Sequence, residues 1–326
     1  MGSEPLLVLR ALGLGDALTG IAALRALRRM VAPRPLLLAA PSVIGGWLQQ
    51  LGEVDAVVPT PDLDADPPGR ALGVHDADDL HGNGPASRDL LAAAGPRRLL
   101  AFADPASRVE WRADEHEVAR WLRLVASIGA EGSVDDLRLR SLAEAEAARG
   151  HTVVVHPGAA FASRRWPVER WAEVVRRLAA DGHPVTVTLG PGEGSLGREL
   201  LDDHLRGAVT LQQADLPALA RTVGAARLLL CGDTGVAHLA TALAVPSVLL
   251  FGPIAPDRWG PAIDHERHTL IWHGDGTGDP HGCVIDPALA RTTPDEVVAA
   301  ADDLLRRWRP AAPPVPPSAG RSPARR

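Results

Sequence analysis

The length, composition and charge of the chain exclude several classes of protein. At 326 residues it exceeds what a single hydrophobic core usually organises, so two domains are expected. Hydrophobic residues make up 46% and charged residues 23%, which is the balance of a soluble globular protein rather than a disordered one. The net charge of −6 does not fit a nucleic-acid binder, which needs a basic surface.

The basic residues restrict the chemistry further, because all 34 of them are arginine. No lysine can act as a base or form a Schiff base, so a phosphate clamp must use arginine, histidine or helix ends. The two cysteines, Cys231 and Cys283, cannot form a disulfide framework. The apolar N-terminal stretch is too short for a membrane span and has no signal-peptide pattern. We therefore expect a cytoplasmic protein, with at most peripheral contact at the inner face of the membrane.

The first part of the chain alternates apolar runs with amphipathic stretches. The run at 5–10 predicts a strand, and near-helical spacing from residue 17 predicts a helix to about residue 31. Further strands are expected at 36–40, 54–58 and 99–102, and a strong helix at 115–128. Residues 130–150 are charged and alanine-rich, and we place the end of the first domain at residue 145.

From residue 152 the alternation begins again and predicts a second parallel-sheet domain over residues 146–290. The strands are expected at 152–155, 184–189, 209–211, 227–231 and 247–251, and the helices at 167–180, 194–205, 215–224 and 234–244. A capping box at 293–296 opens a last helix, in a segment (291–309) that can pack back on the N-terminal domain. The Pro/Arg-rich tail, 310–326, is expected to be disordered.

The first candidate for chemistry is the sequence Gly13-Leu14-Gly15-Asp16, between the first strand and the first helix. A dinucleotide-binding fingerprint does not fit, because Leu18 occupies the position that must be small. Asp16 either caps the helix or stands as a carboxylate at the carboxyl edge of a parallel sheet. In the second interpretation it can act as a general base.

The second candidate follows the strand that ends at His156-Pro157-Gly158. Arg164 and Arg165 lie just before the helix at 167–180. Guanidinium groups beside a helix N-terminus suit a diphosphate, although two solvated surface arginines are the alternative.

The third candidate, Cys231-Gly-Asp-Thr-Gly-Val-Ala-His238, ends an apolar strand and begins a helix. Asp233 and Thr234 can cap that helix, Gly235 removes side-chain bulk, and His238 lies one turn in. The segment suits an anion. A capped helix with a core histidine is the alternative.

A histidine-rich stretch near the end is the fourth candidate. It contains His265, His268, His273, His281 and Cys283, interleaved with Asp275 and Asp279. These spacings match no standard zinc pattern, so we expect a surface loop and no metal.

Taken together, these segments resemble glycosyltransferase family 9, the heptosyltransferase-type enzymes of bacterial surface-glycan assembly. The resemblance is carried by LVLRALGLGDALTGIAALRAL, DADDLHGNGPASRDLLAAAG, VVVHPGAAFASRRWPVERWAEVV and CGDTGVAHLATALAVPSVLLFGP, of which the last is the most specific. It implies an α/β GT-B fold, with two Rossmann-like parallel-sheet domains facing a central cleft. The N-terminal domain would hold the acceptor and the C-terminal domain the nucleotide sugar.

The resemblance also implies roles for individual residues. Asp16 matches the family's proposed base, and Arg164 stands where the family usually has a lysine that contacts the donor diphosphate. The remaining matches are Asp233, Thr234, Gly235 and His238 for the phosphate-binding D-T-G-x-x-H element, Glu193 and Ala214 for the nucleoside, and Gly13, Gly15, His81 and Asn83 for the acceptor side. Ala159 and Ala160 depart from the pattern, because some relatives carry Thr or Ser there. Because of this departure and of the arginine at position 164, the identity of the donor stays open.

The implied function is inverting transfer of a heptose-like sugar from a nucleotide-diphosphate donor, such as an ADP-linked one, to a glycan or lipid-linked hydroxyl, with Asp16 as general base. No cofactor beyond this co-substrate, no metal and no nucleic-acid partner are expected, and we expect a monomer. Two alternatives stay open. One is a catalytically silent nucleotide-sugar-binding protein, which Ala159 and Ala160 support, and the other is a GT-B nucleotide-sugar epimerase.

Overall fold

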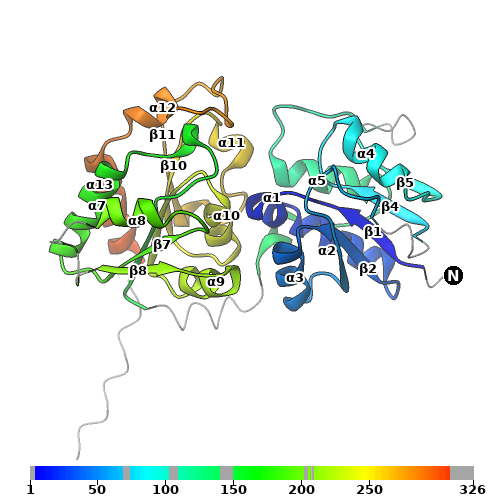
Figure 1. The fold of residues 1–326 in the computed structure, drawn as a ribbon, viewed down its shortest axis with the longest axis horizontal. Helices are drawn as coiled ribbons and strands as arrows, with labels where there is room; N and C mark the ends of the chain where they lie inside the picture. The colour runs from blue at the N-terminus through cyan, green and yellow to red at the C-terminus, as the bar shows by residue number, and fades with distance from the viewer. Residues whose placement is uncertain are drawn as a thin grey trace, which may run out of the picture.

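The computed structural model of the chain describes residues 4–68, 74–102, 109–139, 150–201, 205, 207 and 209–308. These residues form two α/β domains, each built on one sheet whose paired strands are parallel (Figure 1). This confirms the expected fold class. The expected domain boundary at residue 145 and the tail at 310–326 lie outside the described residues. No helix in the described part of the chain is long and apolar enough to cross a membrane.

The N-terminal domain is organised around a five-stranded sheet in the order β3-β2-β1-β4-β5. Its strands are β1 (Leu6–Leu9), β2 (Leu36–Ala40), β3 (Ala56–Pro59), β4 (Asp76–Asp79) and β5 (Arg98–Leu100). β1 and β2 are continuous apolar runs and are buried throughout, as strands of a sheet covered on both faces must be. β4 was not expected, because three of its four residues are aspartates.

The helices of this domain match the prediction only in part, because the first of them begins at residue 14 and not at residue 17. They are α1 (Leu14–Thr19), α2 (Ile21–Val31), α3 (Ser42–Gln50), α4 (Pro85–Ala92), α5 (Glu117–Ala126) and the short 3-10 helix η2 (Val134–Leu137). The single helix expected from residue 17 is two helices separated at Gly20. A Cβ on Gly20 would lie 2.9 Å from the Arg10 side chain, so the absence of a side chain at Gly20 leaves room for a buried arginine. The early start places Asp16 inside the first turn of α1.

The C-terminal domain contains a six-stranded sheet in the order β11-β10-β9-β6-β7-β8. Its strands are β6 (Val153–His156), β7 (Val185–Leu189), β8 (Val209–Gln213), β9 (Leu228–Gly232), β10 (Ser247–Phe251) and β11 (His268–Trp272), of which β11 was not predicted. The helices are η3 (Ala162–Arg164), α7 (Val168–Ala180), α8 (Gly194–Leu200), α9 (Leu216–Gly224), α10 (Gly235–Ala242), α11 (Pro256–Trp259), η4 (His265–Arg267), α12 (Pro287–Arg291) and α13 (Pro294–Arg307).

The last helix, α13, packs on the C-terminal domain and not on the N-terminal one. It contacts α7 and the strands β9, β10 and β11, and Figure 1 shows it on the side away from the N-terminal sheet. Its buried face, which includes Val297, Ala301 and Leu304, belongs to the same apolar cluster as Trp171 of α7. The idea that this segment returns to the N-terminal domain was therefore wrong, because its apolar face is already covered by its own domain.

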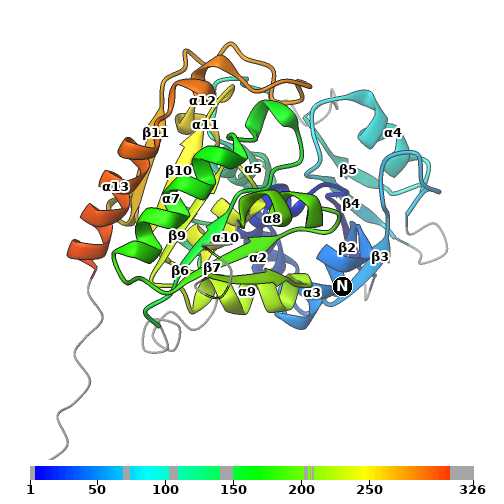
Figure 2. The same ribbon diagram turned by 60° about the vertical axis from the view of Figure 1, so that its left-hand side comes forward.

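The two domains meet where α1 packs against α10, near the centre of Figure 1, and α10 also lies near the centre of the turned view in Figure 2. One apolar cluster continues across this contact, with Leu18 from α1 and Val236 from α10 among its buried members. Polar contacts reinforce the packing. The Leu139 N–H donates to the Ala242 carbonyl at 2.8 Å, and Arg138 Nη2 lies 2.5 Å from Asp264 Oδ1. We call this region the interdomain junction.

Candidate functional site

Asp16 lies at the carboxyl end of β1, in the first turn of α1. It is not the N-cap of this helix, because that position is occupied by Gly13 and has no side-chain cap bond. The capping interpretation is therefore wrong. Burial raises the pKa of the Asp16 carboxyl above its usual value, while the nearby Arg10 guanidinium opposes the rise. A half-buried carboxylate of this kind is a stronger base than one in water.

Arg10 was not among the predicted site residues, although it is the side chain that anchors Asp16. It is 1% exposed, and its Nε donates to the backbone carbonyl of Asp16. Its Nη1 donates to the carbonyl of Leu80, and its Nη2 donates to Thr19 Oγ1 at 3.0 Å and to Glu117 Oε1 at 3.3 Å. A charged residue that ends a buried strand directly before a Gly-rich turn was the signal available in the sequence.

Asp233 follows β9 in the C-terminal domain. It is buried, and Arg164 Nη1 lies 3.4 Å from its carbonyl oxygen and 3.9 Å from Oδ2. Burial raises the pKa of Asp233 to about 6, Arg164 opposes that rise, and Asp16 adds to it. Arg164 in turn lowers the pKa of Asp16. Two carboxylates and one guanidinium from both domains therefore act on each other at the junction.

Arg164 is not placed where the sequence suggested, beside the N-terminus of α7. That helix has Pro167 as its N-cap, and Arg164 instead reaches the turn between β9 and α10. Within the described residues its Nε is buried without a hydrogen-bond partner, so the guanidinium keeps a donor for a ligand. Arg165 points elsewhere and donates to the carbonyls of Ala159 at 2.7 Å and Ala160 at 3.3 Å.

Thr234 and Gly235 lie at the start of α10, and Gly235 lies against the other domain. Thr234 is the N-cap and makes no side-chain cap bond. Gly235 faces α1, because a Cβ there would lie 2.8 Å from the Leu14 Cβ and 2.9 Å from the Gly15 nitrogen. The space that Gly235 leaves is therefore occupied by the other domain. The N–H groups in the first turn of α10 remain donors that an anion can use.

His238 also points across the junction and not toward the edge of its own sheet. A Cβ on Gly15 would lie 2.9 Å from its Cδ2, and its ring packs edge-on against Trp259 with centroids 5.9 Å apart. Burial lowers the pKa of His238 to about 4, and His116, Arg10 and Arg164 add to that effect, so the ring is neutral.

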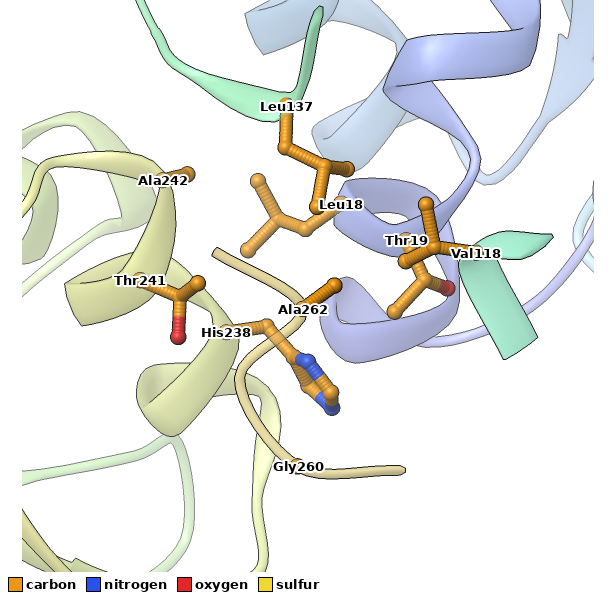
Figure 3. A pocket seen from close by; sticks show the side chains of 9 residues that line it. All are labelled: Leu18, Thr19, Val118, Leu137, His238, Thr241, Ala242, Gly260 and Ala262. Atoms are coloured by element: carbon orange, nitrogen blue, oxygen red, sulfur yellow. The ribbon is translucent and has the colours of Figure 1, made fainter. Parts of the chain in front are cut away.

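A small cavity lies beside His238 between the domains (Figure 3). Its volume is about 10 Å³, which is room for about one water molecule. Its lining comes from both domains: Leu18, Thr19, Val118, Leu137, His238, Thr241, Ala242, Gly260 and Ala262. The domains are thus closely packed at this point, and a sugar or nucleotide does not fit there.

A second pair of interdomain partners, His116 and Gly260, was missed by the sequence reasoning. The Val118 N–H lies 3.2 Å from His116 Nδ1, so Nδ1 accepts and Nε2 carries the proton. His116 Nε2 then donates to the Gly260 carbonyl at 3.0 Å. Burial lowers the pKa of His116, which keeps it in this neutral form.

Glu193 belongs to a separate cluster, at the carboxyl ends of β6 and β7. Its Oε2 accepts from the Gly190 N–H at 2.7 Å, and a Cβ on Gly158 would lie 2.2 Å from both carboxylate oxygens. Gly158 thus makes room for Glu193. His156 Nδ1 lies 3.1 Å from Thr188 Oγ1, and burial lowers the pKa of His156 although Glu193 opposes the shift.

Ala214 is half-buried and follows β8, next to the α9 N-cap Asp215. Gln213, the last residue of β8, donates from Nε2 to the Gly190 carbonyl at 3.5 Å and so connects the loops that carry Glu193 and Ala214. Both predicted nucleoside residues therefore lie at the carboxyl edge of the C-terminal sheet, where ligands bind in folds of this type.

On the predicted acceptor side, Gly13 and Asn83 are exposed and Gly15 is half-buried against α10. The His81 backbone N–H donates to Asp79 Oδ1 at 2.9 Å. Burial lowers the pKa of His81 to about 4, and Arg10 adds to the effect. Among the described residues His81 Nδ1 has no hydrogen-bond partner, so a neutral imidazole near Arg10 keeps one free nitrogen.

The late histidines are spread over different structures. His268 is buried with Nδ1 2.8 Å from Ser247 Oγ, His273 Nε2 lies 3.0 Å from Glu296 Oε1, and the His281 ring packs on Phe161. In the described part of the chain no group of three or more His, Cys, Asp or Glu side chains could hold a metal ion.

Two parallel-sheet α/β domains that pack through α1 and α10, with polar groups at the carboxyl edges of both sheets, define the GT-B class of fold. The sequence profile of "Glycosyltransferase family 9 (heptosyltransferase)" matches residues 95–276. The chain belongs to glycosyltransferase family 9.

Individual relatives agree with this assignment. Lipopolysaccharide heptosyltransferase 1 of Pseudomonas aeruginosa is 30% identical over 171 residues, which cover 52% of this chain and 47% of the relative. The match thus spans about half the length of that protein. The solved structure of the Escherichia coli ADP-heptose lipopolysaccharide heptosyltransferase II has a TM-score of 0.75 at 20% identity, over 93% of this chain and 99% of that one. The family 9 glycosyltransferase structure from Veillonella parvula has a TM-score of 0.74 at 16% identity, over 94% of this chain and 98% of that one. Both share the fold.

Proposed function

We propose that the protein transfers a heptose-like sugar from a nucleoside-diphosphate donor to a hydroxyl of a glycan or lipid-linked acceptor, with inversion at the anomeric carbon. The observation that carries the proposal is that Arg164 reaches the turn after β9, beside Asp233, where α10 packs against the helix that holds Asp16 in this family 9 chain. In this arrangement, the N-terminal domain supplies a carboxylate, and the C-terminal domain supplies a guanidinium and a helix N-terminus. The names of the relatives support ADP-heptose as the donor and lipopolysaccharide as the acceptor class.

In the proposed reaction, Asp16 takes the proton of the acceptor hydroxyl while the oxygen of that hydroxyl bonds to the anomeric carbon. The bond from that carbon to the diphosphate oxygen breaks on the opposite face, and its electron pair leaves with ADP. A general base of this kind contributes about 10²–10⁴-fold to the rate. The raised pKa of Asp16 supports this role, because a carboxylate that burial makes more basic accepts a proton more readily.

Charge on the departing diphosphate would be stabilised by Arg164 and by the N–H groups that begin α10. The free Nε donor of Arg164 supports its part in this step. Asp233 would hold the guanidinium in place, since its carbonyl lies 3.4 Å from Arg164 Nη1. His238, which is neutral and packed on Trp259, would keep the two domains together and not carry charge.

The nucleoside would occupy the loops after β7 and β8, where Glu193 can accept hydrogen bonds from ribose hydroxyls and Ala214 leaves room for the base. The acceptor would lie against the N-terminal domain, near His81, Asn83 and the turn from Gly13 to Gly15. No resident cofactor or metal is part of the proposal. Both sides of the site come from one chain, which supports a monomeric enzyme, and an acceptor of this class implies peripheral contact at the cytoplasmic face of a membrane.

The direct test uses ADP-heptose as donor and heptose-deficient lipopolysaccharide as acceptor. We expect release of ADP that depends on the acceptor, and a product whose anomeric configuration, measured by NMR, is opposite to that of the donor. Retained configuration would refute the proposed mechanism. Donor binding without transfer would favour a silent binding protein, and release of an epimerised sugar without acceptor would favour an epimerase.

A further inference from the structure

We propose that Arg10 is a positioning residue which holds the Asp16 backbone in place, and that Arg10 and Glu117 together set the charge balance at the Asp16 carboxylate. The inference rests on the proposed role of Asp16 as the base.

The backbone of Asp16 is held from two sides. Arg10 Nε donates to its carbonyl oxygen, and Thr19 Oγ1 donates to the same oxygen at 2.9 Å. Arg10 Nη2 in turn donates to Thr19 Oγ1 at 3.0 Å. The guanidinium also lies 4.8 Å from the centroid of the Trp121 ring. Two donors on one carbonyl oxygen fix the peptide from which the carboxylate extends.

Glu117 balances the charge of Arg10. Its Oε1 accepts from Arg10 Nη2 at 3.3 Å and from Trp121 Nε1 at 2.7 Å, and its Oε2 accepts from Arg120 Nη1. Glu117 and both arginines are buried. Buried ionised groups act on each other through a low dielectric, so their effect on Asp16 is larger than that of surface charges. Arg10 lowers the pKa of Asp16 and Glu117 raises it.

Other charged groups face Asp16 from the C-terminal domain, namely Arg164 and Asp233. His238 also packs against α1, and His81 lies near Arg10, but both are neutral because burial lowers their pKa to about 4. The influence of Arg164 and Asp233 depends on contact between the domains. Arg10 and Glu117 belong to the same domain as Asp16, so their influence persists when the domains separate.

The test is an NMR titration of the Asp16 side-chain carboxyl carbon in the full chain without substrate. We expect Arg10→Met to raise the pKa of Asp16 by about 1 unit, because a cation is removed. We expect Glu117→Gln to lower it, because an anion is removed while the hydrogen-bonding shape is kept. A purely structural role of this pair would not shift the pKa in opposite directions.

The matched controls come from a second Arg–Glu pair in the same domain. Arg25 Nε and Nη2 donate to Glu53 at 2.7 and 2.5 Å, and Glu53 is buried to the same degree as Glu117. Neither residue takes part in the hydrogen bonds that hold the Asp16 backbone or the Arg10 guanidinium. Arg25→Met and Glu53→Gln should therefore reduce thermal stability but leave the pKa of Asp16 unchanged. Arg10→Lys, which retains the charge, should keep the pKa close to that of the unmodified protein.

An activity profile gives the second readout. The acid limb of kcat with ADP-heptose should move to higher pH in Arg10→Met and to lower pH in Glu117→Gln, with little change in donor KM. If Arg10→Met does not fold, Glu117→Gln and Arg10→Lys decide the question. An unchanged Asp16 pKa in Glu117→Gln, or a shift in the same direction in both charge-removing variants, would overturn the inference. Shifts as expected together with an active Asp16→Asn variant would instead refute the proposed base and leave the electrostatic inference standing.

Discussion

A Cβ built on Gly235 would lie 2.9 Å from the backbone nitrogen of Gly15, so these two glycines bring α10 and α1 into backbone contact across the interdomain junction. A Cβ on Gly15 would in turn lie 3.4 Å from the Cα of Gly235 and 2.9 Å from the ring of His238. The packing of the two domains therefore depends on the absence of a side chain at both positions.

We expect Gly235→Ala to push the two domains apart. The methyl group would meet Leu14 and Gly15, and overpacking of this kind costs about 1–3 kcal/mol. Denaturant unfolding would measure the loss of stability, and small-angle scattering would measure the increase in the radius of gyration. Gly46→Ala in α3 is the control, because a Cβ there meets nothing within 4 Å and should stabilise the helix by up to about 1 kcal/mol. Equal stability and size in the two variants would contradict the packing described here.

We expect Arg164→Ala to weaken the binding of ADP more than that of AMP, because the proposed partner of Arg164 is the distal phosphate. A lost hydrogen bond to a charged group corresponds to about 1.5–3 kcal/mol. Calorimetric titration with both nucleotides provides the measurement. The neighbouring Arg165→Ala is the control and should affect both nucleotides equally, since Arg165 contacts only backbone carbonyls of the 159–160 turn. If Arg164→Ala lost the same affinity for ADP and for AMP, Arg164 would not be part of the diphosphate site.

Glu193 allows a prediction that separates nucleoside binding from phosphate binding. Gly158→Ala should displace the Glu193 carboxylate, which is the movable end of a side chain, so the fold should persist. AMP and ADP should then lose the same affinity, about 1–3 kcal/mol, as they do in Glu193→Gln. Glu199→Gln, at an exposed position on α8, the helix that follows Glu193, should change neither affinity. Nucleotide binding that survives both Gly158→Ala and Glu193→Gln would place the nucleoside elsewhere.

His238 should make the protein less stable in acid. Its pKa is about 4 in the folded state, against 6.5 for an ordinary histidine, so between these values the unfolded chain binds more protons. The free energy of unfolding therefore falls as the pH is lowered through this window, by about 3 kcal/mol for a shift of this size. His238→Gln should remove that part of the pH dependence, as measured by urea unfolding at several pH values. A variant with the same acid sensitivity as the original chain would show that His238 is not buried in the neutral form.

Much of the fold could be predicted from the sequence, because both sheets rest on continuous apolar runs. The strands at 36–40 and 247–251 have the expected bounds. The strand β4 could not be predicted from an apolar run. Its residues Asp78 and Asp79 are buried, with Arg98 Nη1 2.9 Å from Asp78 Oδ1 and Ser87 Oγ donating to Asp79 Oδ2 at 2.6 Å. These partners are set by tertiary structure and leave no hydrophobic pattern.

The candidate site was predictable as a set of motifs but not as a set of contacts. Asp16, Arg164 and Asp233 were each identified, and the structure brings them near one another. A glycine in a sequence does not show what fills the space it leaves, so the contact of Gly235 with α1 could not be predicted. The pair of Arg10 and Glu117 is separated by 107 positions, and only the folded structure brings them together.

The most direct test of the central proposal is the turnover of Asp16→Asn with ADP-heptose and heptose-deficient lipopolysaccharide, measured together with the affinity for ADP. The substitution keeps the size of the side chain and removes the base, while the nucleotide contacts belong to the other domain. We expect kcat to fall by at least about a hundredfold, with ADP affinity within a few-fold of the original value. Turnover close to that of the unmodified protein would contradict the assignment of Asp16 as the base.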